Sequence, residues 1–162
     1  MHKTEKYKKI IHDAGHYFDG YEIDLVGKMS IIVSLLKNSF PDWVFCGFYR
    51  VVKEDLLEIG PYQGNIIPCA QIDFSRGVCG KSASTNETII VNNVKDFTGY
   101  ISCDDVTVSE IVVPVTANNR LIAVLDIDGK DAGQFDATDQ EYLESIVKFL
   151  LYKKGLEKRP FL

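Results

Sequence analysis

Three cysteines lie close together in the chain, and three acidic residues follow them within apolar segments. The cysteines are Cys69, Cys79 and Cys103. The acids are Glu110, Asp126 and Asp128. A cluster of thiols offers a nucleophile and a second thiol to resolve it, whereas carboxylates on a buried face are costly unless they meet a cation or share a proton. The combination indicates redox chemistry on a small molecule that is positively charged or zwitterionic.

The surroundings of the cysteines differ. Cys79 stands between Arg76 and Lys81, where a helix is expected to begin, and both the helix N-terminus and the cations favour a lowered thiol pKa. Cys103 lies in a segment without periodicity, where a nucleophile can move. Cys46 is flanked by aromatic residues, which is typical of a small buried side chain. For each of the three clustered cysteines alone, a packed structural thiol is the alternative interpretation.

A zinc site is the rival use of a thiol cluster. Structural zinc sites favour two close pairs of ligands, but the gaps between the clustered cysteines are nine and twenty-three residues. The three histidines, His2, His12 and His16, all fall at the first predicted helix. The spacing therefore predicts no metal site.

The two aspartates of the acidic set are two residues apart in an apolar strand pattern. Asp126 and Asp128 should therefore face the same side of a sheet, the side of Ile122 and Val124. Like charges placed together raise one pKa unless a cation lies between them. The alternative is a strand end where the acids emerge into water, or a turn at Asp128-Gly129.

Length, composition and charge limit the class of protein. The 162 residues fit a single domain, and 46% hydrophobic with 25% charged residues is typical of a globular protein without a membrane span. A net charge of -5 argues against nucleic-acid binding. The first residues lack the apolar core of a secretory signal, which favours a cytoplasmic location and thiols that are not structural disulfides.

The hydrophobic pattern predicts the order of the elements. Helices are expected over 4–19, 22–39, 77–86 and 138–156. Strands are expected over 43–52, 56–61, 66–74, 88–92, 109–117 and 121–128. Residues 94–108 have no clear period and are expected to form a long loop. This order predicts an α+β fold, with one mainly antiparallel sheet over 43–128 and helices against one face.

Two local signals refine this outline. A hairpin turn at Asn118-Asn119 would pair the last two strands and set Glu110 near the two aspartates. Thr138 and Glu141 have the spacing of a capping box, which predicts where the last helix begins.

Five motifs occur in order between about residues 43 and 150. They are Gly60-Pro61-Tyr62-Gln63-Gly64, Gly77-Val78-Cys79-Gly80, Ile101-Ser102-Cys103-Asp104, Ser109-Glu110-Ile111-Val112-Val113-Pro114 and Val124-Leu125-Asp126-Ile127-Asp128. Together they resemble the GAF-domain free methionine-(R)-sulfoxide reductases, and general GAF sensor domains do not resemble this combination of thiols and acids. The resemblance implies a single GAF domain over 1–162, with a central antiparallel sheet of about six strands flanked by helices.

The resemblance also assigns roles. It implies Cys103 as the attacking thiol, Cys69 as the usual resolving partner and Cys79 as a further redox cysteine. The three acids would bind the free amino acid and help to protonate the sulfoxide oxygen. Tyr49 matches a pocket aromatic residue. Phe45 stands where the family pattern Trp-x-Gly-Phe-Tyr has its tryptophan. Trp43, two residues earlier, should share the strand face of Phe45, which leaves two alternatives: Trp43 replaces the missing indole, or nothing does.

The activity implied is thiol-dependent reduction of free L-methionine-(R)-sulfoxide to methionine, through a sulfenic acid and an intramolecular disulfide. An external dithiol, such as thioredoxin, would restore the enzyme, and no resident cofactor is implied. GAF domains often dimerise through terminal helices, so the resemblance suggests a homodimer. The alternative is a non-catalytic GAF module that binds a small molecule or senses oxidation without turnover.

Overall fold

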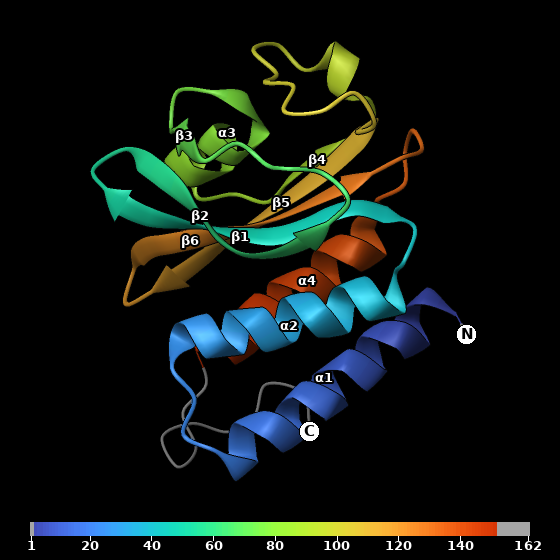
Figure 1. The fold of residues 1–162 in the computed structure, drawn as a ribbon, viewed down its shortest axis with the longest axis vertical. Coiled ribbons are helices and arrows are strands. Elements are labelled where there is room, and N and C mark those ends of the chain that lie inside the picture. Colours follow the sequence, from blue (N-terminus) through green and yellow to red (C-terminus); the bar gives the residue numbers. More distant parts are fainter. Residues whose placement is uncertain (1, 152–162) are drawn as a thin grey trace.

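The computed structural model describes residues 2–151, which form eleven elements (Figure 1). The helices are α1 (Lys3–Gly20), α2 (Leu25–Ser39), α3 (Gly77–Thr85), the 3-10 turn η1 (Val94–Asp96) and α4 (Ala137–Leu150). The strands are β1 (Trp43–Lys53), β2 (Leu56–Gly64), β3 (Gln71–Asp73), β4 (Ile89–Val91), β5 (Ser109–Ala117) and β6 (Arg120–Gly129). Apart from the short turn η1, every element corresponds to one that the hydrophobic pattern predicts.

The six strands form one antiparallel sheet in the order β3-β2-β1-β6-β5-β4. Helices α1, α2 and α4 lie on one side of it, whereas α3 and the long loops lie on the other (Figure 1). The predicted α+β class is therefore confirmed, but the prediction of helices against one face is wrong for α3 (Figure 1). The hairpin between β5 and β6 is also confirmed, because Asn118 and Asn119 both adopt the positive φ angles that a tight turn requires.

The helix side of the sheet holds the larger apolar core. Helix α1 buries Tyr7, Ile10, Ala14 and Phe18 at intervals of three and four residues, which is the stripe that its sequence predicts. Helices α2 and α4 bury similar stripes against Phe48, Leu125 and other inward residues of the sheet. Cys46 lies fully buried in this core, in agreement with its interpretation as a small hydrophobic residue.

Two helix starts differ from the sequence prediction. Helix α2 begins at Leu25 rather than residue 22, because the Asp24 side chain accepts a hydrogen bond from Gly27 N (2.7 Å) and caps the first turn. In α4 the capping box is formed by Asp136 and Asp139, so the prediction from Thr138 and Glu141 is wrong by two residues. The predicted extension of this helix over 152–156 lies outside the described residues.

The predicted strand over 66–74 is mostly wrong. Only Gln71–Asp73 pairs with β2, while residues 66–70 form an irregular loop between β2 and β3. Two features favour the loop: Pro68 cannot donate a ladder hydrogen bond, and Ile67 is 86% exposed. This loop places Cys69 on the side of the sheet opposite α1, α2 and α4, which is called the loop side below.

Two irregularities in strand pairing overturn predicted faces. Trp43 and Phe45 are two residues apart in β1, but their partners in β6, Gly129 and Asp128, are adjacent. This bulge makes the two aromatic side chains face opposite sides of the sheet. Trp43 packs in the helix-side core and does not substitute for an indole beside Phe45. A second shift in the β5–β6 pairing puts Ile122 on the helix side, although Val124 does face the aspartates' side as expected.

No helix within residues 2–151 combines the length and the apolar character that crossing a bilayer requires.

Candidate active site

Three neighbouring strands bring the acids together. Glu110 on β5 pairs with Asp128 on β6, which in turn pairs with Phe45 on β1. Directly opposed side chains on one face of antiparallel strands lie about 5 Å apart at Cβ. Asp126 projects from the same face two residues before Asp128, as the strand period predicts. The expected grouping of the three acids is therefore observed.

The acids are buried in the loop side of the sheet, where they do not emerge into water. Glu110, Asp126 and Asp128 are only 5%, 6% and 8% exposed. Burial, and then repulsion from Asp126, raises the pKa of Glu110 and of Asp128 well above the usual range. Burial also raises the pKa of Asp126, to about 7, although contacts with Cys79 and Glu110 oppose the rise. The site is therefore poised to share protons or to receive a cation.

Cys79 sits on the first turn of α3, above the acids. Gly77 starts this helix with a φ of +65°, a conformation that favours glycine, and the turn presents the thiol to Asp126. Burial raises the Cys79 pKa well above its usual value, and Asp126 and Glu110 raise it further. The predicted lowering of this pKa is wrong, because Arg76 and Lys81 are exposed to water while the thiol faces carboxylates.

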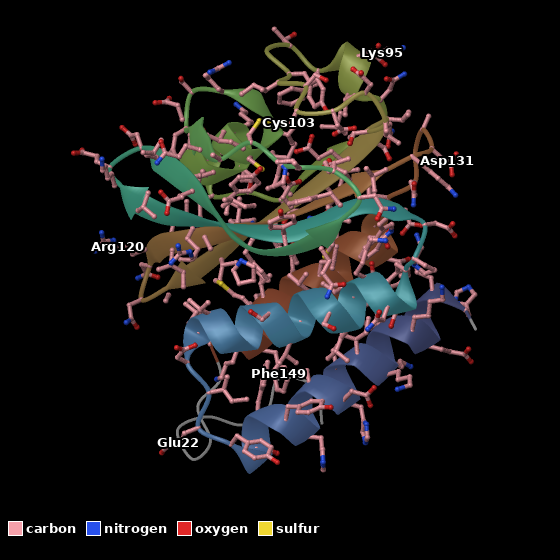
Figure 2. All side chains as sticks on the ribbon, viewed as in Figure 1. Glu22, Lys95, Cys103, Arg120, Asp131 and Phe149 are labelled. Atoms are coloured by element: carbon pink, nitrogen blue, oxygen red, sulfur yellow. A yellow bond between two sulfur atoms is a disulfide. The ribbon has the colours of Figure 1, made fainter. Side chains whose placement is uncertain are left out.

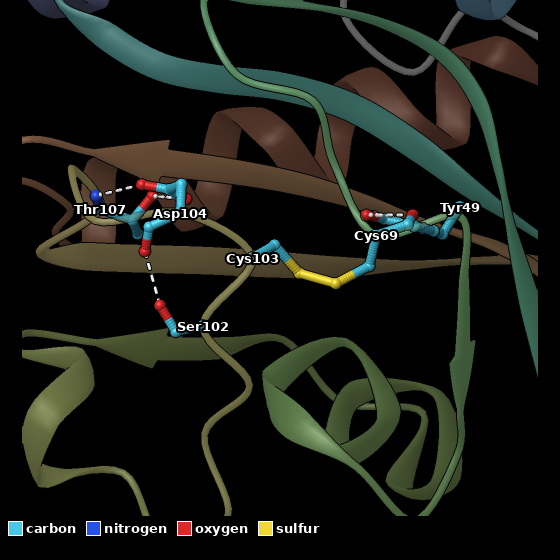
Figure 3. Close-up of a disulfide and its surroundings, with 6 residues drawn as sticks. All are labelled: Tyr49, Cys69, Ser102, Cys103, Asp104 and Thr107. Carbon is cyan, nitrogen blue, oxygen red and sulfur yellow. Dashed lines mark hydrogen bonds between the residues drawn. A yellow bond between two sulfur atoms is a disulfide. The ribbon is translucent and has the colours of Figure 1, made fainter.

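Cys69 and Cys103 form a disulfide between two loops that are separated by 34 residues in sequence (Figure 3). Their Cα atoms are 5.7 Å apart, within the normal range for such a bond. Cys69 follows the 66–68 segment, and Cys103 lies on the long loop before β5, as predicted. Both residues are partly exposed, so an external reductant can approach them. Cys46 lies on the opposite side of the sheet and cannot take part.

An aromatic wall of Phe45, Tyr49 and Tyr62 lies beside the acids, because Phe45 pairs with Asp128 on the neighbouring strand. The Phe45 ring stacks on Tyr62, with centroids 5.7 Å apart, and also contacts Tyr49. Gly47 permits this packing, since a Cβ there would lie 2.6 Å from the Phe45 ring and 2.5 Å from Tyr62 Cβ. The Tyr49 hydroxyl donates a hydrogen bond to the Cys69 carbonyl (3.1 Å; Figure 3), which ties the wall to the disulfide loop.

Asp104 is a site residue to which sequence reasoning gave no role. Its carboxylate accepts hydrogen bonds from Val106 N, Thr107 N and Thr107 Oγ1 at 2.6–2.8 Å, which fixes the loop next to Cys103 (Figure 3). An aspartate in a loop often accepts hydrogen bonds from the backbone N–H groups two and three residues further on. Asp104, within the predicted loop, is therefore a turn signal that could have indicated this role. Tyr100 and Ile101, on the same loop, also line the site.

A cavity of about 40 Å³ lies between these groups. Its lining joins Phe45 and Tyr49 of the aromatic wall to the Cys79 turn, Cys103, Asp104 and the three buried acids. Among the described residues that line it there is no lysine, arginine or histidine. Cys79, Glu110 and Asp126 are also near enough to one another to hold a metal ion. The arrangement can therefore attract a positively charged group and place it beside a redox-active thiol pair.

Known proteins share this fold and sequence. A model of the GAF domain matches residues 24–149. Free methionine-R-sulfoxide reductase of Saccharomyces cerevisiae is 41% identical over 130 residues, which cover 78% of this chain and 72% of that protein. The Escherichia coli protein of the same name is 35% identical over 147 residues, with 91% and 87% covered.

Structural similarity agrees. The structure of free methionine-R-sulfoxide reductase from Neisseria meningitidis in complex with its substrate superposes with a TM-score of 0.87 and 34% identity, over 93% of this chain and 89% of that one. The suspected resemblance is therefore confirmed: the chain belongs to the GAF-domain family of free methionine-R-sulfoxide reductases.

Proposed function

We propose that this protein is an oxidoreductase that reduces free L-methionine-(R)-sulfoxide to L-methionine. The observation that carries the proposal is the position of the Cys69–Cys103 disulfide at a cavity lined by three buried acids and no basic residue among the described lining. Such a site pairs a thiol couple with a strong preference for a cationic group, and a free amino acid supplies an ammonium. The family to which the chain belongs supports the same activity.

In the proposed reaction, Cys103 is the attacking thiol and Cys69 resolves it. The Cys103 thiolate attacks the sulfoxide sulfur, the oxygen is transferred to the thiol with uptake of a proton, and methionine leaves a Cys103 sulfenic acid. The Cys69 thiol then displaces water from that sulfenic acid, which forms the disulfide. The pairing of these two cysteines supports this order. An external dithiol takes the disulfide back to two thiols.

Cys79 is proposed as a further redox partner. It lines the same cavity as Cys103, but its raised pKa keeps it protonated, and a protonated thiol is a poor nucleophile. We therefore assign it a step after the first attack.

The acids are proposed to bind the substrate ammonium and to supply the proton that the sulfoxide oxygen needs. A group with a raised pKa, such as Glu110, holds a proton near neutral pH, as a general acid must. Asp126 and Asp128 would complete the ammonium site, while Phe45 and Tyr49 provide an apolar surface for the S-methyl end. A methionine sulfoxide within a peptide has no free ammonium and would be excluded.

The reductant, location and assembly are further parts of the proposal. We infer that thioredoxin is the dithiol, because the disulfide is partly exposed and no resident cofactor is required by the chemistry. A cytoplasmic location fits a catalytic disulfide that is reduced in each cycle. A homodimer is proposed from the usual behaviour of GAF domains.

The test is consumption of free methionine sulfoxide with dithiothreitol as the reductant. We expect many turnovers with the R epimer, none with the S epimer, and none with methionine-(R)-sulfoxide blocked at its amino group. A GAF module that only senses oxidation would release no more than one equivalent of methionine per chain. That stoichiometry would overturn the proposed enzyme.

A further inference from the structure

One thiol and two carboxylates from three different elements meet above the sheet. Cys79 comes from α3, Glu110 from β5 and Asp126 from β6, and a ligand atom from each lies within 4.8 Å of the other two. All three residues are buried. Their distance in sequence explains why the spacing of cysteines and histidines did not predict a site here.

The donor set suits one class of metal ion. Zinc accepts both thiolate sulfur and carboxylate oxygen as ligands, whereas magnesium and calcium take oxygen ligands alone. Ligand atoms around tetrahedral zinc lie about 3.5 Å apart, so closure of the site requires side-chain shifts of about 1 Å. A second observation is that Asp126 Oδ1 is buried and has no hydrogen-bond partner among the residues that the structure describes, which points to a missing ligand.

The cavity has room for a small ion while the disulfide is formed. A volume of about 40 Å³ holds roughly one to three water-sized groups. A metal ion that keeps one water molecule in its open coordination position fits without opening of the Cys69–Cys103 bridge.

We propose that the disulfide form of this protein binds one zinc-class divalent cation through Cys79 Sγ, Glu110 and Asp126, and that the ion occupies the place of the substrate ammonium. Binding displaces the thiol proton of Cys79, so zinc affinity rises with pH. The ion neutralises part of the charge of three adjacent carboxylates that face no basic side chain in the described lining. Zinc would thus be an inhibitor of the site rather than a cofactor.

The test is titration of the oxidised protein with zinc chloride in a competition assay with a chromophoric chelator. Before the titration, thiols are counted by alkylation of a separate sample under denaturing conditions. This count verifies that Cys46 and Cys79 are the only free cysteines. We expect one ion per chain, release of about two protons, one from Cys79 and one from Glu110, and at least tenfold weaker binding in Cys79→Ser and in Glu110→Gln. Cobalt(II) in place of zinc should give a thiolate charge-transfer absorption that Cys79→Ser abolishes.

Cys46→Ala is the matched control, because this cysteine is equally buried on the opposite side of the sheet. Its zinc affinity should equal that of the unsubstituted protein. Stoichiometric zinc binding that survives both Cys79→Ser and Glu110→Gln would assign the ion to surface groups such as the histidines near α1 and would overturn the proposal. Absence of binding would overturn it as well. Circular dichroism of each variant separates loss of the site from loss of the fold.

Competition with substrate is a second arm, and it rests on the proposed function. The double variant Cys69→Ser/Cys103→Ser cannot form the disulfide and retains Cys79 as the one thiol lining the described cavity. We expect free methionine sulfoxide to bind this variant and zinc to raise its apparent Kd at least tenfold. Zinc binding without any sulfoxide binding would contradict the proposed substrate and leave the metal site standing. Simultaneous binding of both would contradict the competition.

Discussion

The two faces of the sheet use the same strands for opposite purposes. On the helix side, α1, α2 and α4 cover a continuous apolar core that includes Phe48 and Cys46. On the other side, a short helix and loops cover acids, thiols and a small cavity. Figure 2 shows Cys103 above the sheet and Phe149 among the helices below it. The strand period of two thus separates residues that stabilise the protein from residues that react.

The buried polar groups on the loop side of the sheet, which is the reactive face, lower the stability of the protein. Burial of carboxylates without a positive partner lowers stability, and the helix-side core offsets that cost. A strained or destabilised site on a well-packed scaffold is a frequent arrangement in enzymes. Substitutions that are equivalent in chemistry should therefore have different consequences on the two faces.

The largest contrast is expected between two cysteines. Cys103→Ser should lower turnover of free methionine-(R)-sulfoxide by at least about a thousandfold, because serine is not a comparable nucleophile for the sulfoxide sulfur, and should leave the fold intact. Cys46→Ala should keep the Michaelis constant and lose only stability, because this thiol packs in the helix-side core. Steady-state kinetics with thermal unfolding checks both. Near-normal turnover by Cys103→Ser would remove Cys103 from the reaction.

Adjacent aromatic residues of β1 sharpen the comparison. Phe48→Ala should lower the free energy of unfolding by about 3–5 kcal/mol, because it opens a cavity between the sheet and the helices. Tyr49→Phe should change it by about 1 kcal/mol or less, since only the hydrogen bond to the Cys69 carbonyl is lost. That loss should instead slow disulfide formation after a single turnover. Urea unfolding and quenched-flow thiol counting measure the two effects, and equal stability losses would contradict the division of the sheet.

The helix side could be predicted from the sequence because its signals are local. The apolar stripes of α1 and α4 and the alternation along β5 and β6 are each contained in one segment. The two-residue spacing of Asp126 and Asp128, with the hairpin at Asn118-Asn119, even placed the acids correctly beside Glu110.

The loop side could not be predicted in the same way because its geometry depends on contacts between distant segments. The environment of Cys79 was wrongly predicted, since the flanking cations point to water and the decisive neighbours come from β5 and β6. The face of Trp43 was wrong because one extra residue in a strand pairing leaves no mark in the local pattern. The apolar residues before Cys69 predict a strand, although they form a loop.

Glu110→Gln tests the electrostatic cost of the reactive face. Burial and the neighbouring aspartate raise the pKa of Glu110, and burial raises the pKa of Asp126 to about 7, so the folded protein holds more protons than the unfolded chain above about pH 4. Stability from these groups is complete below about pH 4 and is lost as the pH rises through the folded-state pKa. The variant should therefore be more stable than the parent at pH 8 and should flatten the fall of stability with pH.

The same variant should weaken substrate binding. Loss of one charged hydrogen bond to an ammonium corresponds to about a 10- to 100-fold higher Michaelis constant. Chemical denaturation at pH 4, 6 and 8, together with kinetics at pH 8, measures both properties. An unchanged Michaelis constant would place Glu110 outside the substrate site. A loss of stability at pH 8 would contradict the inference that the buried Glu110 carboxylate destabilises the folded protein at that pH.

Asp139 is the buried acid of the opposite face, and its substitution should act in the opposite direction. It is 1% exposed and accepts hydrogen bonds from Tyr7 Oη (2.7 Å) and Lys3 Nζ (2.7 Å), which join α1 to α4. Asp139→Asn should lower the free energy of unfolding by about 1–3 kcal/mol, because these donors lose a charged acceptor. The Michaelis constant should stay unchanged. Asp42→Asn, at an exposed pair with Lys130, is the control and should change neither property. If Asp139→Asn were more stable than the parent, the hydrogen-bond donors of Asp139 would not explain why its burial differs in its effect on stability from burial of Glu110.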